Sequence, residues 1–301
     1  MCVTAAAGQR DLASVAARGV ADVHVGPYDS VPPRRTAPAR RLGPTELCPA
    51  ATAKMATVPL PTTKVAFDDS MVLPEPRTGP PPRVIAVQAS MFDHARELAQ
   101  APGPRRRVAI HNFANNYRPG LLRTDASGKH FFITHTQEEQ LLRATMVDGH
   151  IVLPLDAYPI SEGCHICGLY TRDARFANDP RTAQPLAPER HFVADIITCA
   201  APKYPRLNED GEYTPEARQA MLRHMVLVIN MAKDADVFVT GLWGCGAFSH
   251  PISASLRLWK EAIQLAAAVP KEIHFCYFLD GLTNLQTQAE GSASIMDLVT
   301  Q

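Results

Sequence analysis

Short apolar runs recur along the chain from about residue 84 onward. They are rich in Val, Ile and Phe and are bounded by turn residues, which is the pattern of buried strands. The runs that predict strands are Val84–Val87, Val108–Ile110, Phe192–Cys199, Asp236–Thr240 and Ile273–Leu279.

Amphipathic stretches lie between these runs. Apolar residues recur every three or four positions, and this spacing predicts helices over Met91–Leu98, Gln137–Val147, Pro215–Lys233 and Ser253–Ala268. The third helix has a favourable start, Thr214-Pro215-Glu216, with a hydroxyl cap, a proline and an acid. We expect a long insertion at Pro154–Pro188, which is rich in turn residues. Strands that alternate with helices over residues 84–285 predict an α/β domain with a largely parallel or mixed sheet.

The first 82 residues differ in composition from the rest. They hold thirteen of the 26 prolines, in motifs such as Pro32–Arg35 and Gly79–Pro82. Proline lacks an amide donor and fixes φ, so long helices and central strands are excluded from these stretches. We therefore expect a proline-rich, largely irregular N-terminal segment, 1–82, and a folded domain, 83–301. The segment is mildly basic, which suits a disordered tail or a targeting segment.

Charge and cysteine content narrow the class of protein. The 301 residues carry 30 basic and 30 acidic side chains, so the formal net charge is zero. This balance argues against binding nucleic acid through a broad basic field. No apolar run reaches the roughly 18–20 residues that span a bilayer. Seven widely spaced cysteines do not form a secreted disulfide pattern, and we expect a reducing compartment, the cytoplasm.

A glycine-rich stretch, GLWGCGAFSHP, follows the predicted strand Asp236–Thr240 and begins at Gly241. Glycines between a strand and a helix let the backbone approach a ligand, and amides at a helix start favour anions. The stretch is neither GxGxxG nor a Walker loop. It predicts a phosphate cradle, with a tight strand-to-helix turn as the alternative.

Three other motifs have both a structural and a functional interpretation. In Thr136-Gln137-Glu138-Glu139, the spacing fits a capping box, while one carboxyl could act as a general acid. Asn112 follows a strand end, where an amide binds sugar hydroxyls or forms a turn. Cys164 and Cys167 form a CxxC motif, which could belong to a zinc site only if remote ligands complete it.

Taken in order, these pieces resemble the bacterial-type poly(ADP-ribose) glycohydrolases, a branch of the macrodomain fold. The resemblance covers residues 84–285 and rests on NFAN at Asn112, the turn Pro119-Gly120, QEE at Gln137–Glu139 followed by LLRAT, ITCAAP at Ile197–Pro202, and GLWGCGAF at Gly241–Phe248. It implies a three-layer α/β/α macrodomain with a mixed, mostly parallel central sheet. The chain departs from the family before QEE, where the usual PGGG is replaced by Pro119-Gly120-Leu121-Leu122.

The resemblance also implies roles for individual residues. Glu139 is expected to be the general acid/base, Glu138 to bind ribose hydroxyls and Asn112 to hold the distal ribose. The expected ADP-ribose contacts are Asn112, Phe113, Pro119, Gly120, Gln137, Gly241, Trp243, Gly244, Cys245, Gly246, Ala247 and Phe248. Leu285 stands where an aromatic residue often stacks on adenine, and Phe278 or Tyr277 is the alternative.

The expected function is hydrolysis of the glycosidic bond at the distal ribose of poly(ADP-ribose) or of ADP-ribosylated proteins or nucleic acids, by a monomer without a cofactor. Such a reaction passes through an oxocarbenium-like state, and the leaving oxygen needs a proton from an acid with a raised pKa. Two alternatives remain open. The altered glycine loop suits a reader that binds ADP-ribose without catalysis, and the CxxC motif suits a zinc-stabilised interaction module.

Overall fold

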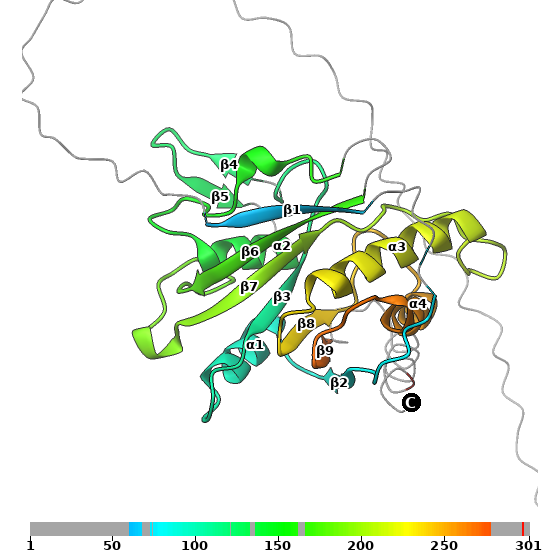
Figure 1. Ribbon diagram of the computed structural model, residues 1–301. Helices are drawn as coiled ribbons and strands as arrows, with labels where there is room; N and C mark the ends of the chain where they lie inside the picture. The colour runs from blue at the N-terminus through cyan, green and yellow to red at the C-terminus, as the bar shows by residue number, and fades with distance from the viewer. Residues whose placement is uncertain are drawn as a thin grey trace, which may run out of the picture. The chain divides into compact units, whose positions relative to one another are not determined.

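A seven-stranded sheet lies at the centre of the protein, whose computed structural model describes residues 60–67, 73, 75–120, 122–132, 136–161, 166–277 and 297. The strand order is β1-β6-β7-β3-β8-β9-β2 (Figure 1). The pairings from β7 to β2 are parallel, whereas β6 is antiparallel to both β1 and β7. The strands are β1 (Thr62–Phe67), β2 (Arg83–Val87), β3 (Val108–Phe113), β6 (Ile166–Phe176), β7 (Phe192–Cys199), β8 (Val237–Gly241) and β9 (Glu272–Cys276).

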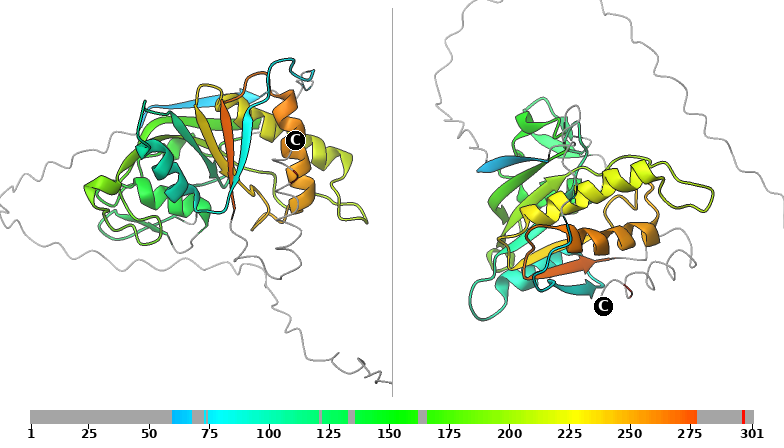
Figure 2. Two further views of the ribbon diagram at one scale, coloured as in Figure 1. Left: turned by 90° about the horizontal axis from the view of Figure 1, so that it is seen from below. Right: turned by 45° about the vertical axis from the view of Figure 1, so that its right-hand side comes forward.

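Helices cover both faces of this sheet, as the left view of Figure 2 shows. Helices α1 (Met91–Gln100) and α2 (Gln137–Thr145) pack on one face, and α3 (Pro215–Met231) and α4 (Ile252–Leu265) on the other. Two short 3₁₀ turns, Leu155–Ala157 and Pro188–Arg190, and a hairpin of β4 (Leu122–Thr124) and β5 (His130–Phe132) lie outside the main sheet. The arrangement is a three-layer α/β/α fold with a mixed, mostly parallel sheet, as predicted.

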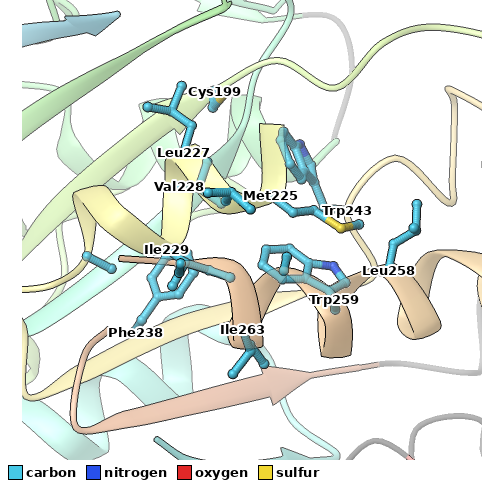
Figure 3. Close-up of a cluster of buried hydrophobic side chains, with 14 of the residues drawn as sticks. Cys199, Met225, Leu227, Val228, Ile229, Phe238, Trp243, Leu258, Trp259 and Ile263 are labelled. Atoms are coloured by element: carbon cyan, nitrogen blue, oxygen red, sulfur yellow. The ribbon is translucent and has the colours of Figure 1, made fainter. Parts of the chain in front are cut away.

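Two apolar cores hold the layers together. Successive residues of a strand point to opposite faces. In β8, Phe238 therefore packs with α3 and α4, while Val237 and Val239 pack with α1 and α2. Figure 3 shows the α3–α4 side, where Phe238 and Trp259 lie among aliphatic side chains. Burial on both faces explains why the central parallel strands appear as continuous apolar runs in the sequence.

The helix starts follow from the local sequence. The Thr214 hydroxyl accepts a hydrogen bond from the Ala217 amide at 3.4 Å, and Pro215 occupies the first helical position of α3. Ser90 caps α1 in the same way by accepting from the Phe92 amide. These interactions satisfy amide groups that a helix start leaves without partners.

Four strands, β1, β4, β5 and β6, lie where the sequence analysis expected none. β6, eleven residues long, falls inside the expected insertion Pro154–Pro188. It was not predicted because its glycine and charged residues hide the pattern of a strand that is buried on both faces along its first half. β1 lies within the segment 1–82 and pairs with β6, so the folded domain extends at least to Thr62, beyond the expected boundary at residue 83. β4 is followed by a turn in which the Asp125 carboxylate accepts from the amides of Ser127 and Lys129, and this turn returns the chain into β5.

The CxxC motif lies only partly within the described residues. Cys167 is buried on β6 opposite Ala66, and its carbonyl accepts a weak hydrogen bond from Cys199 Sγ at 3.5 Å. Cys164 lies outside the described residues. Across the ranges that the structure describes, no group of three His, Cys, Asp or Glu side chains is placed to hold a metal ion. None of the helices in those ranges is long and apolar enough to cross a membrane.

Candidate functional site

A cavity of about 580 Å³ lies at the carboxyl ends of three neighbouring parallel strands, β7, β3 and β8. This edge of an open α/β sheet is where such folds bind ligands. Asn115 follows β3, Lys203 and Tyr204 follow β7, and the glycine-rich loop follows β8. The lining residues are Phe113, Asn115, Gly120, Thr136, Gln137, Glu138, Glu139, Lys203, Tyr204, Leu242, Trp243, Gly244, Gly246, Ala247 and Phe248.

Helix α2 brings two acidic residues to this cavity at its first turn. It begins at Gln137 after Thr136, as predicted, but Thr136 makes no side-chain cap to the helix amides. Its hydroxyl donates instead to the Glu139 carboxylate. The expected capping box is therefore absent, because the Thr136 hydroxyl is engaged by the Glu139 side chain. Both glutamates are buried, with 2% and 3% of Glu138 and Glu139 exposed, at the positive end of the helix dipole.

The Glu138 carboxylate holds the loop that precedes the helix. Its Oε2 accepts from the amides of Gly120 at 2.7 Å and Asn115 at 3.0 Å, and its Oε1 accepts from the Tyr158 hydroxyl at 3.3 Å. Burial raises the pKa of Glu138 to about 8, although the two backbone amides act in the opposite direction. The sequence analysis expected Glu138 to bind ribose hydroxyls, whereas its oxygens here already accept three hydrogen bonds from the protein.

The Gln137 side chain joins α2 to the end of β3. Its Oε1 accepts from the Phe113 amide and its Nε2 donates to the His111 carbonyl, both at 2.8 Å. The Gln137 side chain therefore makes the two hydrogen bonds that the backbone of a neighbouring strand would make, and it fixes the start of the helix against the sheet. This explains a glutamine directly before the two glutamates without requiring it to bind a ligand.

Gly120 lies directly against the Glu139 carboxyl group. It has a φ of +49°, and a Cβ at this position would lie 2.6 Å from Glu139 Oε1. Only glycine satisfies both the backbone conformation and the close approach. Leu122, two residues later, begins β4 and packs against the core beneath α1 and α2, while Leu121 lies outside the described residues. Among the described residues between Gly120 and the end of the hairpin, only Gly120 lines the cavity.

The glycine-rich loop lines the cavity with six of its residues, Leu242, Trp243, Gly244, Gly246, Ala247 and Phe248. The amides of Gly246, Ala247 and Phe248 donate no hydrogen bond to another residue within the described ranges. Gly244 has a φ of +81°, and a Cβ there would lie 2.7 Å from the His250 ring. Consecutive unengaged amides in such a loop form a favourable anion site. The loop therefore forms the tight strand-to-helix turn, and the phosphate cradle stays a prediction.

His250 fixes this loop from behind. Its two ring nitrogens contact the Tyr213 hydroxyl at 2.8 Å and the Pro202 carbonyl at 2.7 Å. The ring is buried, and desolvation lowers the pKa of His250, which favours its neutral form. The Tyr204 amide donates to the Phe248 carbonyl at 3.1 Å, which ties the loop after β7 to the loop after β8.

Some expected site residues line the cavity, and others lie outside its lining. Asn112 is fully buried, donates to the Thr198 hydroxyl at 3.3 Å and does not line the cavity. Pro119, Gly241 and Cys245 do not line it either, although each adjoins a residue that does. Phe278 and Leu285 lie outside the described residues, and Tyr277 packs against the α3–α4 core.

Five lining residues escaped the sequence analysis: Asn115, Thr136, Lys203, Tyr204 and Leu242. Lys203 lies over the Phe248 ring at 5.0 Å, and Tyr204, with a φ of +51°, is 69% exposed. A tyrosine with positive φ is a strained residue of the kind found at functional sites. Asn115, Thr136 and Leu242 belong to motifs that the sequence analysis recognised, whereas Lys203 and Tyr204 only follow the motif ITCAAP.

Comparison with known proteins identifies solved structures that share this fold. No family model and no curated protein matches the chain. A poly(ADP-ribose) glycohydrolase from Deinococcus radiodurans, solved in complex with ADP-ribose, matches at a TM-score of 0.54 and 20% identity, over 72% of this chain and 85% of that one. The chain has the fold of the bacterial poly(ADP-ribose) glycohydrolases.

A second such glycohydrolase, from Thermomonospora curvata, matches at a TM-score of 0.53 and 20% identity, over 77% of this chain and 85% of that one. The same enzyme bound to the inhibitor ADP-HPD matches at a TM-score of 0.51 and 20% identity, over 70% of this chain and 78% of that one. The glycohydrolase fold confirms the three-layer architecture that the resemblance implied.

Proposed function

We propose that this protein is an ADP-ribosyl glycohydrolase and that the cavity beside Glu139 binds ADP-ribose. One observation carries the proposal: a buried carboxyl group and a loop of unengaged amides face one cavity of about 580 Å³. That volume lies in the range of small-molecule sites. The shared fold adds to it, since the neighbouring glycohydrolases were solved with ADP-ribose or ADP-HPD.

In this proposal the diphosphate lies on the amides of Gly246, Ala247 and Phe248. The chain has no net charge, so a local arrangement of backbone dipoles has to neutralise the anion. Lys203, exposed at the rim and held over the Phe248 ring, adds one positive charge. The distal ribose then lies toward Gly120 and Glu139, because these residues line the same cavity.

Glu139 in its protonated form gives its proton to the leaving oxygen as the bond from the anomeric carbon to that oxygen breaks. Positive charge develops on the ring oxygen and the anomeric carbon, and a water molecule adds to that carbon. The water proton passes to the Glu139 carboxylate, which restores the acid. The Thr136 hydroxyl holds the carboxylate by a hydrogen bond, and the absence of a side chain at Gly120 leaves room for it.

Gln137 and Glu138 position this acid without touching the reacting atoms. Gln137 fixes the start of α2 to β3, and Glu138 fixes the loop Asn115–Gly120 to the same helix turn. A displacement of about 1 Å in such a site costs roughly a hundredfold in rate. In this proposal Gln137 and Glu138 are positioning residues, and Glu139 is the acid.

The test is the variant Glu139→Gln, assayed for release of ADP-ribose from a modified macromolecule. We expect turnover to fall by about 10²–10⁴-fold, the usual contribution of general acid–base catalysis, while calorimetry still detects ADP-ribose binding. Glu216→Gln is the matched control, because Glu216 is also an acid in the first turn of a helix, α3, but is exposed. Full activity of Glu139→Gln would refute the assignment.

The second candidate is a reader that binds ADP-ribose without cleaving it. Its support is the hairpin that begins at Leu122, where the family has further glycines. Binding of ADP-ribose without release from polymer, protein-linked or nucleic-acid-linked substrates would favour the reader over the enzyme. The monomeric state and the cytoplasmic location stay predictions from the sequence.

A further inference from the structure

A second cavity, of about 500 Å³, lies at the other end of helix α2. Its walls come from the hairpin β4–β5, the last turn of α2, the turn at Asp148-Gly149 and the loop 178–185. The lining residues are His130, Phe131, Phe132, Arg143, Met146, Asp148, Gly149, Asn178, Arg181, Thr182, Ala183 and Pro185. None of them lines the cavity beside Glu139.

The two cavities lie at the two ends of helix α2. Glu139 lines the first cavity and Arg143 the second, and residues four apart in a helix share a face about 6 Å apart along the axis. The Glu139 carboxyl acts on the Arg143 guanidinium electrostatically, which is consistent with this closeness. Helix α2 thus carries a lining residue of each cavity, about one turn apart.

The walls of the second cavity are fixed by hydrogen bonds. The His130 amide donates to the Gly149 carbonyl at 2.9 Å, and the Ile151 amide donates to His130 Nδ1 at 3.1 Å. On the opposite side, Asn178 Nδ2 donates to the carbonyls of Arg143 and Met146 at the end of α2. The Arg143 guanidinium donates to the Phe132 carbonyl at 3.3 Å, so the hairpin and the loop after β6 are both joined to the helix that carries Glu139.

The chemistry of this cavity is aromatic and cationic. Phe131 is 46% exposed, and the Arg143 guanidinium lies over the Phe132 ring at 5.3 Å. Arg181 is exposed, and its guanidinium forms no hydrogen bond or ion pair with a residue of the described ranges. Asp148 is the one carboxylate among the lining residues. An exposed ring suits stacking of a base, and a free guanidinium suits a phosphate.

We propose that the second cavity binds a nucleotide in the leaving group of the substrate. The proposal rests on the proposed function, because the leaving group is defined by the bond that Glu139 would protonate. The nucleotide could be the next ADP-ribose unit of a polymer or the terminal nucleotide of an ADP-ribosylated nucleic acid. A protein-linked substrate has no such group and gains nothing from this cavity.

The kinetic test uses Phe131→Ala and Arg181→Gln and three substrates: poly(ADP-ribose), an ADP-ribosylated oligonucleotide and an ADP-ribosylated peptide. For each variant we expect the ratio of kcat/KM for a nucleotide-linked substrate to that for the peptide to fall about tenfold, as for the loss of one stacked base or one phosphate contact. A fall for only one of the two nucleotide-linked substrates identifies the source of the nucleotide. An unchanged ratio for both would overturn the proposal.

Matched controls lie elsewhere on the surface. Leu207→Ala removes another exposed apolar side chain, and Arg105→Gln removes an exposed guanidinium at the opposite end of the sheet. We expect both to leave the substrate ratio at the wild-type value. Loss of the ratio in these controls would show that it reflects general surface changes, which also overturns the proposal.

A binding measurement separates this proposal from the proposed function. AMP is titrated into the full-length protein while amide NMR signals are followed. We expect shifts at Phe131, Gly149 and Arg181 that Phe131→Ala abolishes, even if no substrate is hydrolysed. Shifts confined to Gly244–Phe248, or none at millimolar AMP, would overturn the second site while leaving the glycohydrolase proposal intact.

Discussion

Replacement of Gly120 by alanine gives a sharp test of how the protein positions Glu139. The change adds a single methyl group, which would lie 2.6 Å from Glu139 Oε1 and 2.8 Å from its Cγ. These separations are shorter than an optimal contact of about 3.5 Å by about 0.8 Å, so the carboxyl group or the loop has to move by that amount. We expect kcat to fall by about a hundredfold, because a shift near 1 Å has that effect in a positioned site.

Alanine at this position also has a conformational cost, which must be separated from the clash. The φ of +49° costs a non-glycine residue about 1–2 kcal/mol, and the lower entropy of the unfolded chain offsets about 0.4–1 kcal/mol of that cost. Gly211→Ala is the matched control, since Gly211 has a φ of +77° but a Cβ there would meet no atom within 4 Å. This control should lose about 1 kcal/mol of unfolding free energy and keep its activity.

The assay combines urea unfolding with release of ADP-ribose under saturating substrate. Gly120→Ala should lose more stability than Gly211→Ala and should alone lose turnover. If both variants lose the same unfolding free energy and Gly120→Ala keeps the wild-type kcat, then Gly120 does not position Glu139. The close approach would then be a packing detail without a catalytic consequence.

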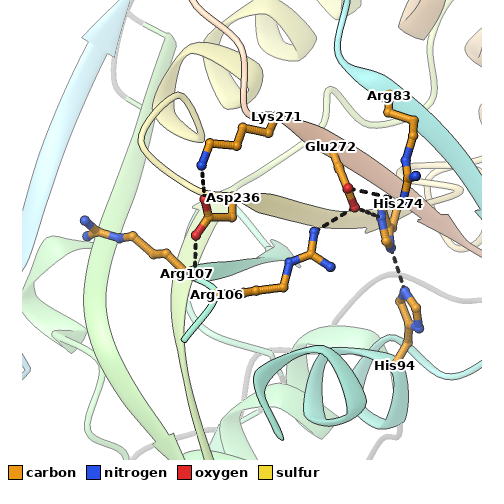
Figure 4. Close-up of polar contacts among 8 residues, drawn as sticks. All are labelled: Arg83, His94, Arg106, Arg107, Asp236, Lys271, Glu272 and His274. Carbon is orange, nitrogen blue, oxygen red and sulfur yellow. Dashed lines mark hydrogen bonds and ion pairs between the residues drawn. The ribbon is translucent and has the colours of Figure 1, made fainter. Parts of the chain in front are cut away.

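Three further predictions concern stability. Burial raises the pKa of Glu138 from 4.5 to about 8, so the folded state holds this proton more tightly than the unfolded state. Its contribution to stability is complete below pH 4.5 and is lost as the pH rises toward about 8. The urea midpoint of the wild type, relative to that of Glu138→Gln, should therefore fall between pH 5 and pH 8. In the network of Figure 4, burial lowers the pKa values of His94 and His274, whose rings share a 2.7 Å hydrogen bond. The free energy of unfolding should therefore fall as the pH drops below 6.5, and it should fall less steeply in His274→Gln. An equal slope in the two proteins would contradict this. Phe238→Ala should cost about 3–5 kcal/mol by urea unfolding, against less than about 1 kcal/mol for the half-exposed Val193→Ala.

The elements that the sequence predicted well are those with a strong local pattern. The strand Phe192–Cys199 has its predicted bounds, and α3 begins at Pro215 after a threonine cap, as expected. Both depend on apolar periodicity and capping, which act over a few neighbouring residues. β6 was missed because its burial depends on tertiary pairing with β7 and with β1, and β1 lies far from it in the sequence.

The candidate site also has features that follow from local sequence and features that depend on residues distant in the chain. The positions of Glu139 at a helix start and of the glycine-rich loop after a strand could be predicted, because each follows from one short segment. The roles of Gln137 and Glu138 could not, because their hydrogen-bond partners are backbone groups more than fifteen residues away in the sequence. Tyr204 could not be foreseen either, since its backbone joins a loop more than forty residues later.

The sequence by itself determined the alternation of strands and helices, the order of the motifs and the fold class, since apolar spacing reports which residues face a core. Only the tertiary structure decided which polar groups meet. It placed Gly246–Phe248 and Glu139 around one cavity, used Glu138 to hold Gly120, buried Asn112 outside the lining of that cavity and formed a second cavity at the far end of α2. Hydrogen bonds and charge contacts act over a few ångströms, so they depend on loops that only the folded chain brings together.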